Sequence, residues 1–171
     1  MGLRQVFPVQ TNKILRAMER TLTSYPYHST INSAEMKFLN YALAALFLVF
    51  AWFQRNDIDP EVYTNPSSID SALWLLFYGL IGLAFILINF KKLPVWYFAL
   101  AVVACLIEMA TCGPGIWANL FGEDKFNMTQ TSMSAEDPRV ELSREFFGAL
   151  IALSAVVFQL WQSRRKSSAT R

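Results

Sequence analysis

Residues 72–90 read ALWLLFYGLIGLAFILINF, and this stretch decides the class of fold. It contains no charged residue and shows no polar face at the helical period of about 3.6 residues, which a helix on the surface of a soluble protein would need. As an α-helix, its 19 residues would rise about 28 Å, close to the roughly 30 Å thickness of a bilayer core. The stretch is therefore predicted to cross a membrane as a helix.

Three further apolar stretches have the same character, at residues 38–54, 94–112 and 146–161, and Glu108 is the only charged side chain within the four. The whole chain is 54% hydrophobic and 16% charged, against about 25% charged in soluble domains. We therefore predict an all-α fold, an integral membrane four-helix bundle formed by residues 36–162.

Capping and turn residues mark the predicted boundaries of the spans. Ser67, with Asp70 three residues later, has the spacing of a capping box before the second span. Pro94 stands where a helix begins, a position at which its missing N–H costs nothing. The Gly-Pro-Gly run at residues 113–115 is expected to end the third span.

Lysine and arginine are distributed unevenly about these spans. The segments before the first span, between the second and third, and after the fourth hold 11 of the 15, and the two other loops hold four. Because basic residues accumulate on the cytoplasmic side, both termini of this multi-pass protein are predicted to lie on that cytoplasm-like side. The net charge of +2 gives no reason to expect a nucleic-acid partner.

The two ends of the chain are predicted to lie outside the bundle. Residues 1–35 form an N-terminal arm rather than a signal peptide, since residues 1–10 lack an apolar stretch. Residues 11–22 have apolar side chains on one face, which fits a short amphipathic helix on the membrane surface. An arm packed on the protein's own loops would account for the pattern equally well. Residues 163–171 are predicted to be a basic C-terminal tail.

Two separated motifs carry a resemblance to a known family. Residues 54–60 read QRNDIDP after the first span, and residues 141–150 read ELSREFFGAL before the fourth. With Trp74 and Tyr78-Gly79, they resemble the transmembrane protein 220 family, whose patterns are Q-x-N-D-P-D-P, W-x-x-x-Y-G and E-x-x-R-E-F-x-G-L. The resemblance covers about residues 37–162 and implies the four-span fold, but no agreed reaction, substrate or cofactor. The polar and turn residues of the motifs are Gln54, Asn56, Asp57, Asp59, Pro60, Glu141, Arg144, Glu145 and Gly148.

This sequence departs from the family pattern at three places. Ile58 replaces a proline, Ala149 is an additional residue, and residues 61–71 look like an insertion. With both termini on one side, the two motifs are nevertheless expected to meet at the opposite face of the membrane.

The acidic residues of the motifs have two interpretations. Asp57, Asp59 and Glu145 could hold Ca²⁺ or Mg²⁺, which prefer oxygen ligands, although calcium-loop spacing is absent. The competing interpretation is structural. Arg144 would clasp Asp57 or Asp59 at two points, while Glu141 and Glu145 would favour the first turn of a helix.

Glu108 is predicted to lie one turn from the outer end of the third span. A charged residue within a span is a functional candidate by default, with a proton, ion or ligand role. The alternative is a structural hydrogen bond or ion pair to Arg55 or Arg144.

The leading functional hypothesis is a non-enzymatic membrane protein, an accessory subunit or binding module whose partners are the lipid bilayer and other membrane proteins. No cofactor is predicted, because a single histidine and the absence of CxxC leave no ligand set for zinc or haem. The alternative is a small transporter or a proton- or ion-handling protein using Glu108 and the acidic cluster. An enzyme ranks third, since no histidine or activated serine or cysteine lies near the acids.

Overall fold

The structure is a computed structural model that describes residues 33–168 apart from Asn56 and Asn65. The amphipathic helix predicted at residues 11–22, and all of the predicted arm before Ser33, lie outside the described residues. Contacts divide the chain into two units, Met1–Met36 and Lys37–Arg171, and the architecture described here is that of the second.

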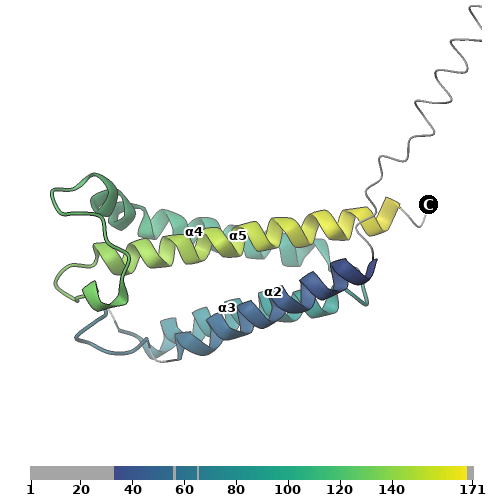
Figure 1. Cartoon of the computed structure of the whole chain (residues 1–171), viewed down its shortest axis with the longest axis horizontal. Helices are drawn as coiled ribbons and strands as arrows, with labels where there is room; N and C mark the ends of the chain where they lie inside the picture. Colours follow the sequence, from purple (N-terminus) through teal and green to yellow (C-terminus); the bar gives the residue numbers. More distant parts are fainter. Residues whose placement is uncertain (1–32, 56, 65, 169–171) are drawn as a thin grey trace, which may run out of the picture. The chain divides into compact units, whose positions relative to one another are not determined.

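Four helices form this unit, and each is long and apolar enough to cross a membrane. They are α2 (Ser33–Gln54), α3 (Ser68–Leu87), α4 (Val95–Phe121) and α5 (Arg139–Ser168), with a short 3-10 turn, η1 (Gln130–Ser132), before α5. Figure 1 shows α4 beside α5 and α2 beside α3. We call the end from which loops 55–67 and 122–138 emerge the loop end, and the opposite end, where α2 begins and α5 finishes, the terminal end. The predicted all-α membrane bundle is confirmed.

The capping prediction for α3 is also confirmed. The Ser67 side chain accepts hydrogen bonds from the backbone N–H groups of Ile69 and Asp70, at 3.3 and 3.4 Å. Pro94 is the N-terminal cap of α4, with an extended backbone.

The expected end of the third span is wrong, because α4 continues through Pro114 to Phe121. Proline inside a helix loses one backbone hydrogen bond, a loss that membrane helices tolerate when a neighbouring helix packs closely. Here α5 supplies that neighbour: a Cβ at Gly115 would overlap the Leu142 side chain. The helix ends at Gly122, whose N–H donates to the carbonyl of Ala118 at 2.8 Å.

Helix α5 is longer than its apolar stretch at both ends. It begins at Arg139 and continues to Ser168, so much of the predicted C-terminal tail is helical. Glu141 lies in its first turn as expected, but Glu145 does not, because the helix starts six residues before it.

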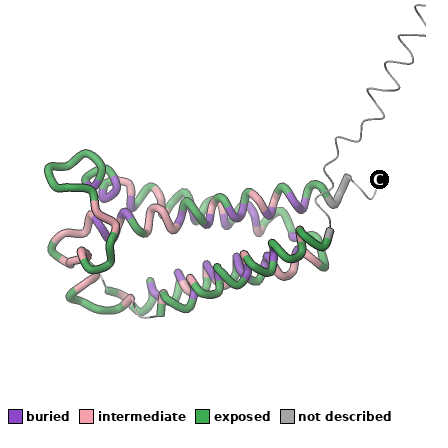
Figure 2. The backbone as a smooth tube through the Cα atoms, in the orientation of Figure 1, coloured by how far each residue is buried: buried purple, intermediate pink, exposed green. Residues whose placement is uncertain are grey.

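The core lies between the helices and is rich in aromatic side chains. Phe47 of α2 stacks on Phe85 of α3, with ring centroids 5.9 Å apart, and Trp74 stacks on Tyr78 at 5.3 Å. Only 22–39% of the apolar 18-residue window of each span is buried within the chain, and exposed positions run along all four helices (Figure 2). Many of these exposed side chains are large and apolar, among them Leu76, Leu100 and Val157. Such a surface is suited to contact with lipid, as in an integral membrane protein.

Hydrogen bonds of buried amide side chains join all four helices toward the terminal end. Asn40 of α2 and Gln162 of α5 exchange two side-chain hydrogen bonds, at 3.0 and 2.8 Å, and Asn40 also donates to Asn89 at 2.8 Å. One turn away, Gln159 donates to the carbonyl of Ile81 and accepts from the Tyr97 hydroxyl. Amide side chains bonded across helices are a common means of joining membrane helices.

Candidate functional site

A cavity of about 730 Å³ opens at the loop end of the bundle. The end of α2, loop 55–67, the start of α3, residues around η1 and the start of α5 all contribute to its wall. The ionisable side chains that line it are five carboxylates, one arginine and two tyrosines: Asp57, Asp59, Asp70, Glu141, Glu145, Arg144, Tyr63 and Tyr78. The two motifs therefore meet around one acidic cavity.

Asp57 has a partner within its own loop. The Tyr63 hydroxyl donates to its carboxylate at 2.6 Å. Burial raises the pKa of Asp57 above its usual range, although the Tyr63 hydrogen bond and the nearby charge of Arg144 oppose that rise. Burial and the carboxylate together raise the pKa of Tyr63, which stays a neutral donor.

Glu141 connects loop 55–67 to α5. Its carboxylate is in a side chain only 8% exposed and accepts from both the backbone N–H and the hydroxyl of Thr64, at 3.0 and 2.9 Å. A weaker backbone bond of 3.4 Å, from Ala135 to Glu61, joins the two loops. These contacts join loop 55–67 to α5 and to loop 122–138 beside the cavity.

The predicted clasp by Arg144 is not formed. Arg144 is exposed and lines the cavity, yet among the described residues it makes no ion pair with Asp57 or Asp59. Asp57 is bonded by Tyr63 instead, and Asp59 accepts from the backbone N–H of Glu61 at 3.0 Å.

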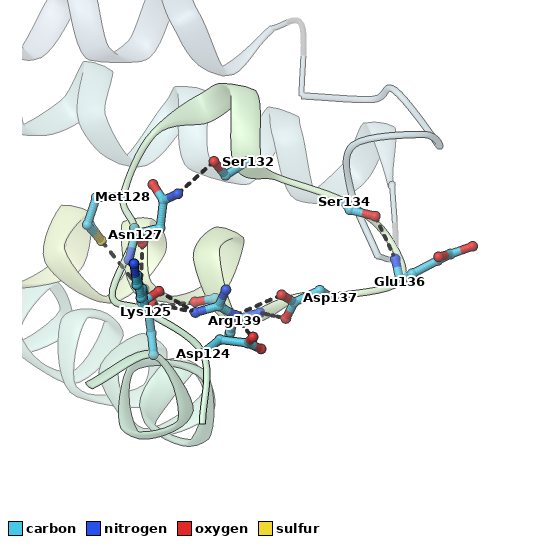
Figure 3. Close-up of polar contacts among 11 residues, drawn as sticks. Asp124, Lys125, Asn127, Met128, Ser132, Ser134, Glu136, Asp137 and Arg139 are labelled. Atoms are coloured by element: carbon cyan, nitrogen blue, oxygen red, sulfur yellow. Dashed lines mark hydrogen bonds and ion pairs between the residues drawn. The ribbon is translucent and has the colours of Figure 1, made fainter. Parts of the chain in front are cut away.

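Arg139, which the motifs did not single out, is the arginine that organises the loop end. It pairs with Asp137 at 2.7 Å and with Asp124 at 3.7 Å, and donates to the carbonyl of Lys125 (Figure 3). It also donates to Asn119, a residue of α4 that is only 1% exposed. Loop 122–138 is thereby fastened to α4 and α5.

Two buried aromatic residues that carry polar groups form part of the cavity wall. Tyr78 is 5% exposed and Trp74 is 9% exposed, and both line it. Among the described residues, neither the Tyr78 hydroxyl nor the Trp74 indole N–H has a hydrogen-bond partner, although no fully enclosed side-chain polar atom lacks one. Both groups therefore face open space in which a ligand or water can reach them.

Glu108 lies deeper along its helix than predicted, because α4 extends to Phe121 and leaves thirteen residues on either side of it. Within the described part of the chain it pairs with neither Arg55 nor Arg144, and Arg55 lies over the Trp52 ring at 3.6 Å. Glu108 lines a second cavity of about 290 Å³ shared with the start of α3.

Glu108 is grouped with two residues of ligand type. Oxygen and sulfur atoms of Glu108, Cys112 and Glu145 all lie within 4.8 Å of one another. The Cys112 thiol donates to Glu145 at 3.2 Å and is buried. This cluster differs from the cation site considered at Asp57, Asp59 and Glu145, of which only Glu145 belongs to it.

The other motif residues have simpler places. The backbone carbonyl of Gln54 accepts from the Ser71 hydroxyl, and its side chain lines the cavity. Pro60 is exposed in a turn, and Gly148 leaves room for the Tyr78 hydroxyl, which a Cβ would overlap. Asn56 lies outside the described residues.

Comparison with protein families identifies the chain. A family model described as "Transmembrane family 220, helix" matches residues 46–161, which is more than half of the sequence. The chain belongs to this family. The part that matches family 220 includes the acidic cavity and the Glu108–Cys112–Glu145 cluster. Comparisons with curated proteins and with solved structures gave no match.

Sequence reasoning missed Cys112, Thr64 and Arg139. Cys112 could have been found, since it lies four residues after Glu108 and hence on the same helix face. Thr64 and Arg139 act through loop conformations that no spacing in the sequence indicates.

Proposed function

We propose that this protein is a non-enzymatic membrane binding module whose loop-end cavity receives a small organic cation bearing an ammonium group. The observation that carries the proposal is the composition of the cavity wall, in which five carboxylates face one arginine beside a stacked tryptophan and tyrosine. The charge attracts a cation, and the aromatic rings select the kind of cation.

Size favours an organic ligand. The cavity of about 730 Å³ falls within the roughly 300–1,000 Å³ of small-molecule pockets and far exceeds what a bare metal ion needs. An ammonium group lying over the face of Trp74 would gain about 2 kcal/mol when desolvated. The Tyr78 hydroxyl can accept a hydrogen bond from a protonated amine.

Binding without catalysis is supported by the same wall. Among the described residues that line it there is no histidine and no cysteine. Glu141 and Asp57 are engaged by Thr64 and Tyr63, which suits a rigid receptor.

The test is the binding of choline to the full chain in a detergent that has no zwitterionic headgroup. The control ligand is 3,3-dimethylbutanol, the uncharged carbon analogue of choline. Choline should raise the melting temperature and the neutral analogue should not. Trp74→Leu should weaken choline binding by about 30-fold, the equivalent of 2 kcal/mol. Trp117→Leu is the control, because Trp117 is 67% exposed on α4 and does not line the cavity. Equal effects of choline and its neutral analogue would refute the proposal.

The ammonium could belong to a soluble amine or to a lipid headgroup, and nanodiscs separate these sources. In phosphatidylglycerol discs choline should stabilise the protein in either case. In phosphatidylcholine discs it should add nothing if the headgroup already occupies the cavity.

A role as an accessory subunit is part of this proposal, and so is the orientation of the termini. Both are supported by the sequence, the second by the 11-to-4 distribution of basic residues. Purification in mild detergent should yield a stoichiometric membrane-protein partner. Tags at both termini should be accessible from the cytoplasmic side, and a cysteine label near Asn127 only from the other.

Ion handling is the second candidate, favoured by the position of Glu108 at the middle of α4 beside its own cavity. Proteoliposomes that show cation flux lost in Glu108→Gln would favour it over a static binding module.

A further inference from the structure

We infer that Glu108, Cys112 and Glu145 form a binding site for one divalent metal ion of the zinc class, which ties α4 to α5. This site binds a different ligand from the proposed ammonium site, although the two share Glu145, which also lines the larger cavity. The two helices contribute unequally: α4 provides Glu108 and Cys112 one turn apart, and α5 provides Glu145.

The geometry is close to that of a metal centre before the ion draws its ligands together. Zn²⁺ binds thiolate sulfur at about 2.3 Å and carboxylate oxygen at about 2.0–2.2 Å, so tetrahedral ligand atoms lie roughly 3.5 Å apart. Here the Cys112 sulfur and the Glu145 oxygen are 3.2 Å apart, and no pair in the cluster exceeds 4.8 Å. Small side-chain rotations would complete the set.

The donor chemistry selects the metal. Ca²⁺ requires six to eight oxygen ligands and Mg²⁺ a near-octahedral oxygen shell, which two carboxylates and a thiol do not supply. A thiolate with carboxylates suits Zn²⁺ and its thiophilic analogue Cd²⁺. Three protein ligands leave a fourth position for water.

The Tyr78 hydroxyl is an independent indication that this region takes a ligand. Tyr78 is only 5% exposed, and its hydroxyl has no hydrogen-bond partner among the described residues. It lies against Gly148, one turn beyond Glu145 on α5, and shares the cavity wall with Glu145. From there it faces the side of α5 that carries Glu145, where it can support a metal-bound water.

Charge gives the reason for a cation. Glu108 and Glu145 stand between apolar helices, and within the described residues neither has an ion pair. Carboxylates within membrane spans are normally matched by a partner or an ion. Each also lines a cavity, Glu145 the larger and Glu108 the smaller, so an ion reaches the cluster without crossing the packed core.

Binding exchanges a proton for the metal. The proton that Cys112 donates to Glu145 leaves as the sulfur–metal bond forms, with no change of oxidation state. Affinity for Zn²⁺ should therefore rise with pH.

The test uses the full chain in detergent, with Cd²⁺ as a spectroscopic probe and Zn²⁺ as the stabilising ion. Wild type should show the ultraviolet thiolate-to-Cd²⁺ charge-transfer band at one equivalent, and Zn²⁺ should raise its melting temperature. Cys112→Ser should lose both effects. Cys105→Ser is the matched control, because Cys105 is also buried on α4 but lies outside the cluster, and it should keep both.

A band that survives in Cys112→Ser, or no stoichiometric band in wild type, would overturn the site. If Cys112→Ser does not fold, Glu108→Gln decides, since it keeps both cysteines and should bind Zn²⁺ at least about tenfold more weakly. Unchanged Zn²⁺ affinity in that variant would also overturn it. Failure of choline to bind would leave these results unaffected, because choline lacks any affinity for the thiol.

Discussion

The amide pair between Asn40 and Gln162 is expected to couple α2 and α5 energetically. Its members are 122 residues apart, are 2% and 4% exposed, and exchange hydrogen bonds of 3.0 and 2.8 Å. We choose Asn40→Leu and Gln162→Met, which keep the approximate shape of each side chain while removing its polar atoms.

The magnitude follows from what each variant leaves unpaired. Either single change strands a donor and an acceptor of the other amide in the core, which should cost about 2–4 kcal/mol of unfolding free energy. Interhelical hydrogen bonds in membranes contribute about 0.6 kcal/mol on average and up to about 1.7, so two bonds should give a coupling energy of about 1–3 kcal/mol. The double variant should therefore be less destabilised than the sum of the singles.

The assay is reversible unfolding in bicelles by added SDS, followed by tryptophan fluorescence, for all four members of the cycle. Ser154→Ala provides the control, since the exposed Ser154 hydroxyl donates only to Leu150 of its own helix and the change should be nearly neutral. Effects that add within about 0.5 kcal/mol would show that the pair does not couple the helices.

Three further outcomes are expected in the same unfolding assay. Gly115→Ala should lower the free energy of unfolding by about 1–3 kcal/mol, because the added Cβ would overlap Leu142 of α5. Gly113→Ala should raise it by about 0.5–1 kcal/mol, because no atom lies within 4 Å of the added Cβ. Equal effects of the two variants would refute the close approach of α4 and α5. Burial raises the pKa of Asp57, so the stability of wild type relative to Asp57→Asn should be greatest at low pH. This difference in stability should shrink as pH rises from about 4 through the raised pKa. A difference that grows with pH would contradict this prediction. Arg139→Ala should lower the free energy of unfolding by about 3 kcal/mol, and Arg144→Ala should lower it by less than about 1 kcal/mol. The reverse order would support the predicted clasp of Asp57 or Asp59 by Arg144.

The membrane fold could be predicted from sequence because lipid permits few solutions. Long apolar stretches must become helices, so hydropathy located all four. The helix ends were less accessible, since they depend on contacts beyond the apolar stretch. The Gly-Pro-Gly signal at residues 113–115 was overridden by packing against α5, and α5 begins at Arg139 because that residue is held by Asp137 and Asn119.

The candidate site was predictable as a region but not in its pairings. Two spans, an even number, lie between the two motifs and place them at one end of the bundle, which brings Asp57 and Glu141 to the same cavity. Their partners, Tyr63 and Thr64, lie in residues 61–71, which look like an insertion relative to the family motifs, and their contacts depend on the conformation of that segment. The buried amides such as Asn40 were overlooked because an uncharged side chain barely lowers the hydropathy of a span.

The amide connection between α2 and α5 also imposes an order on biosynthesis. Helix α2 emerges from the ribosome long before α5 has been translated, so the side-chain oxygen of Asn40 enters the bilayer without its Gln162 donor, although the side-chain nitrogen can bond Asn89 once α3 has been inserted. An unpaired polar group in hydrocarbon costs several kcal/mol, and the insertion intermediate has to bear the part of that cost that Asn89 does not offset until α5 arrives. Chains truncated before the fourth helix should therefore be retained by the insertion machinery and degraded, even though three of their spans are complete.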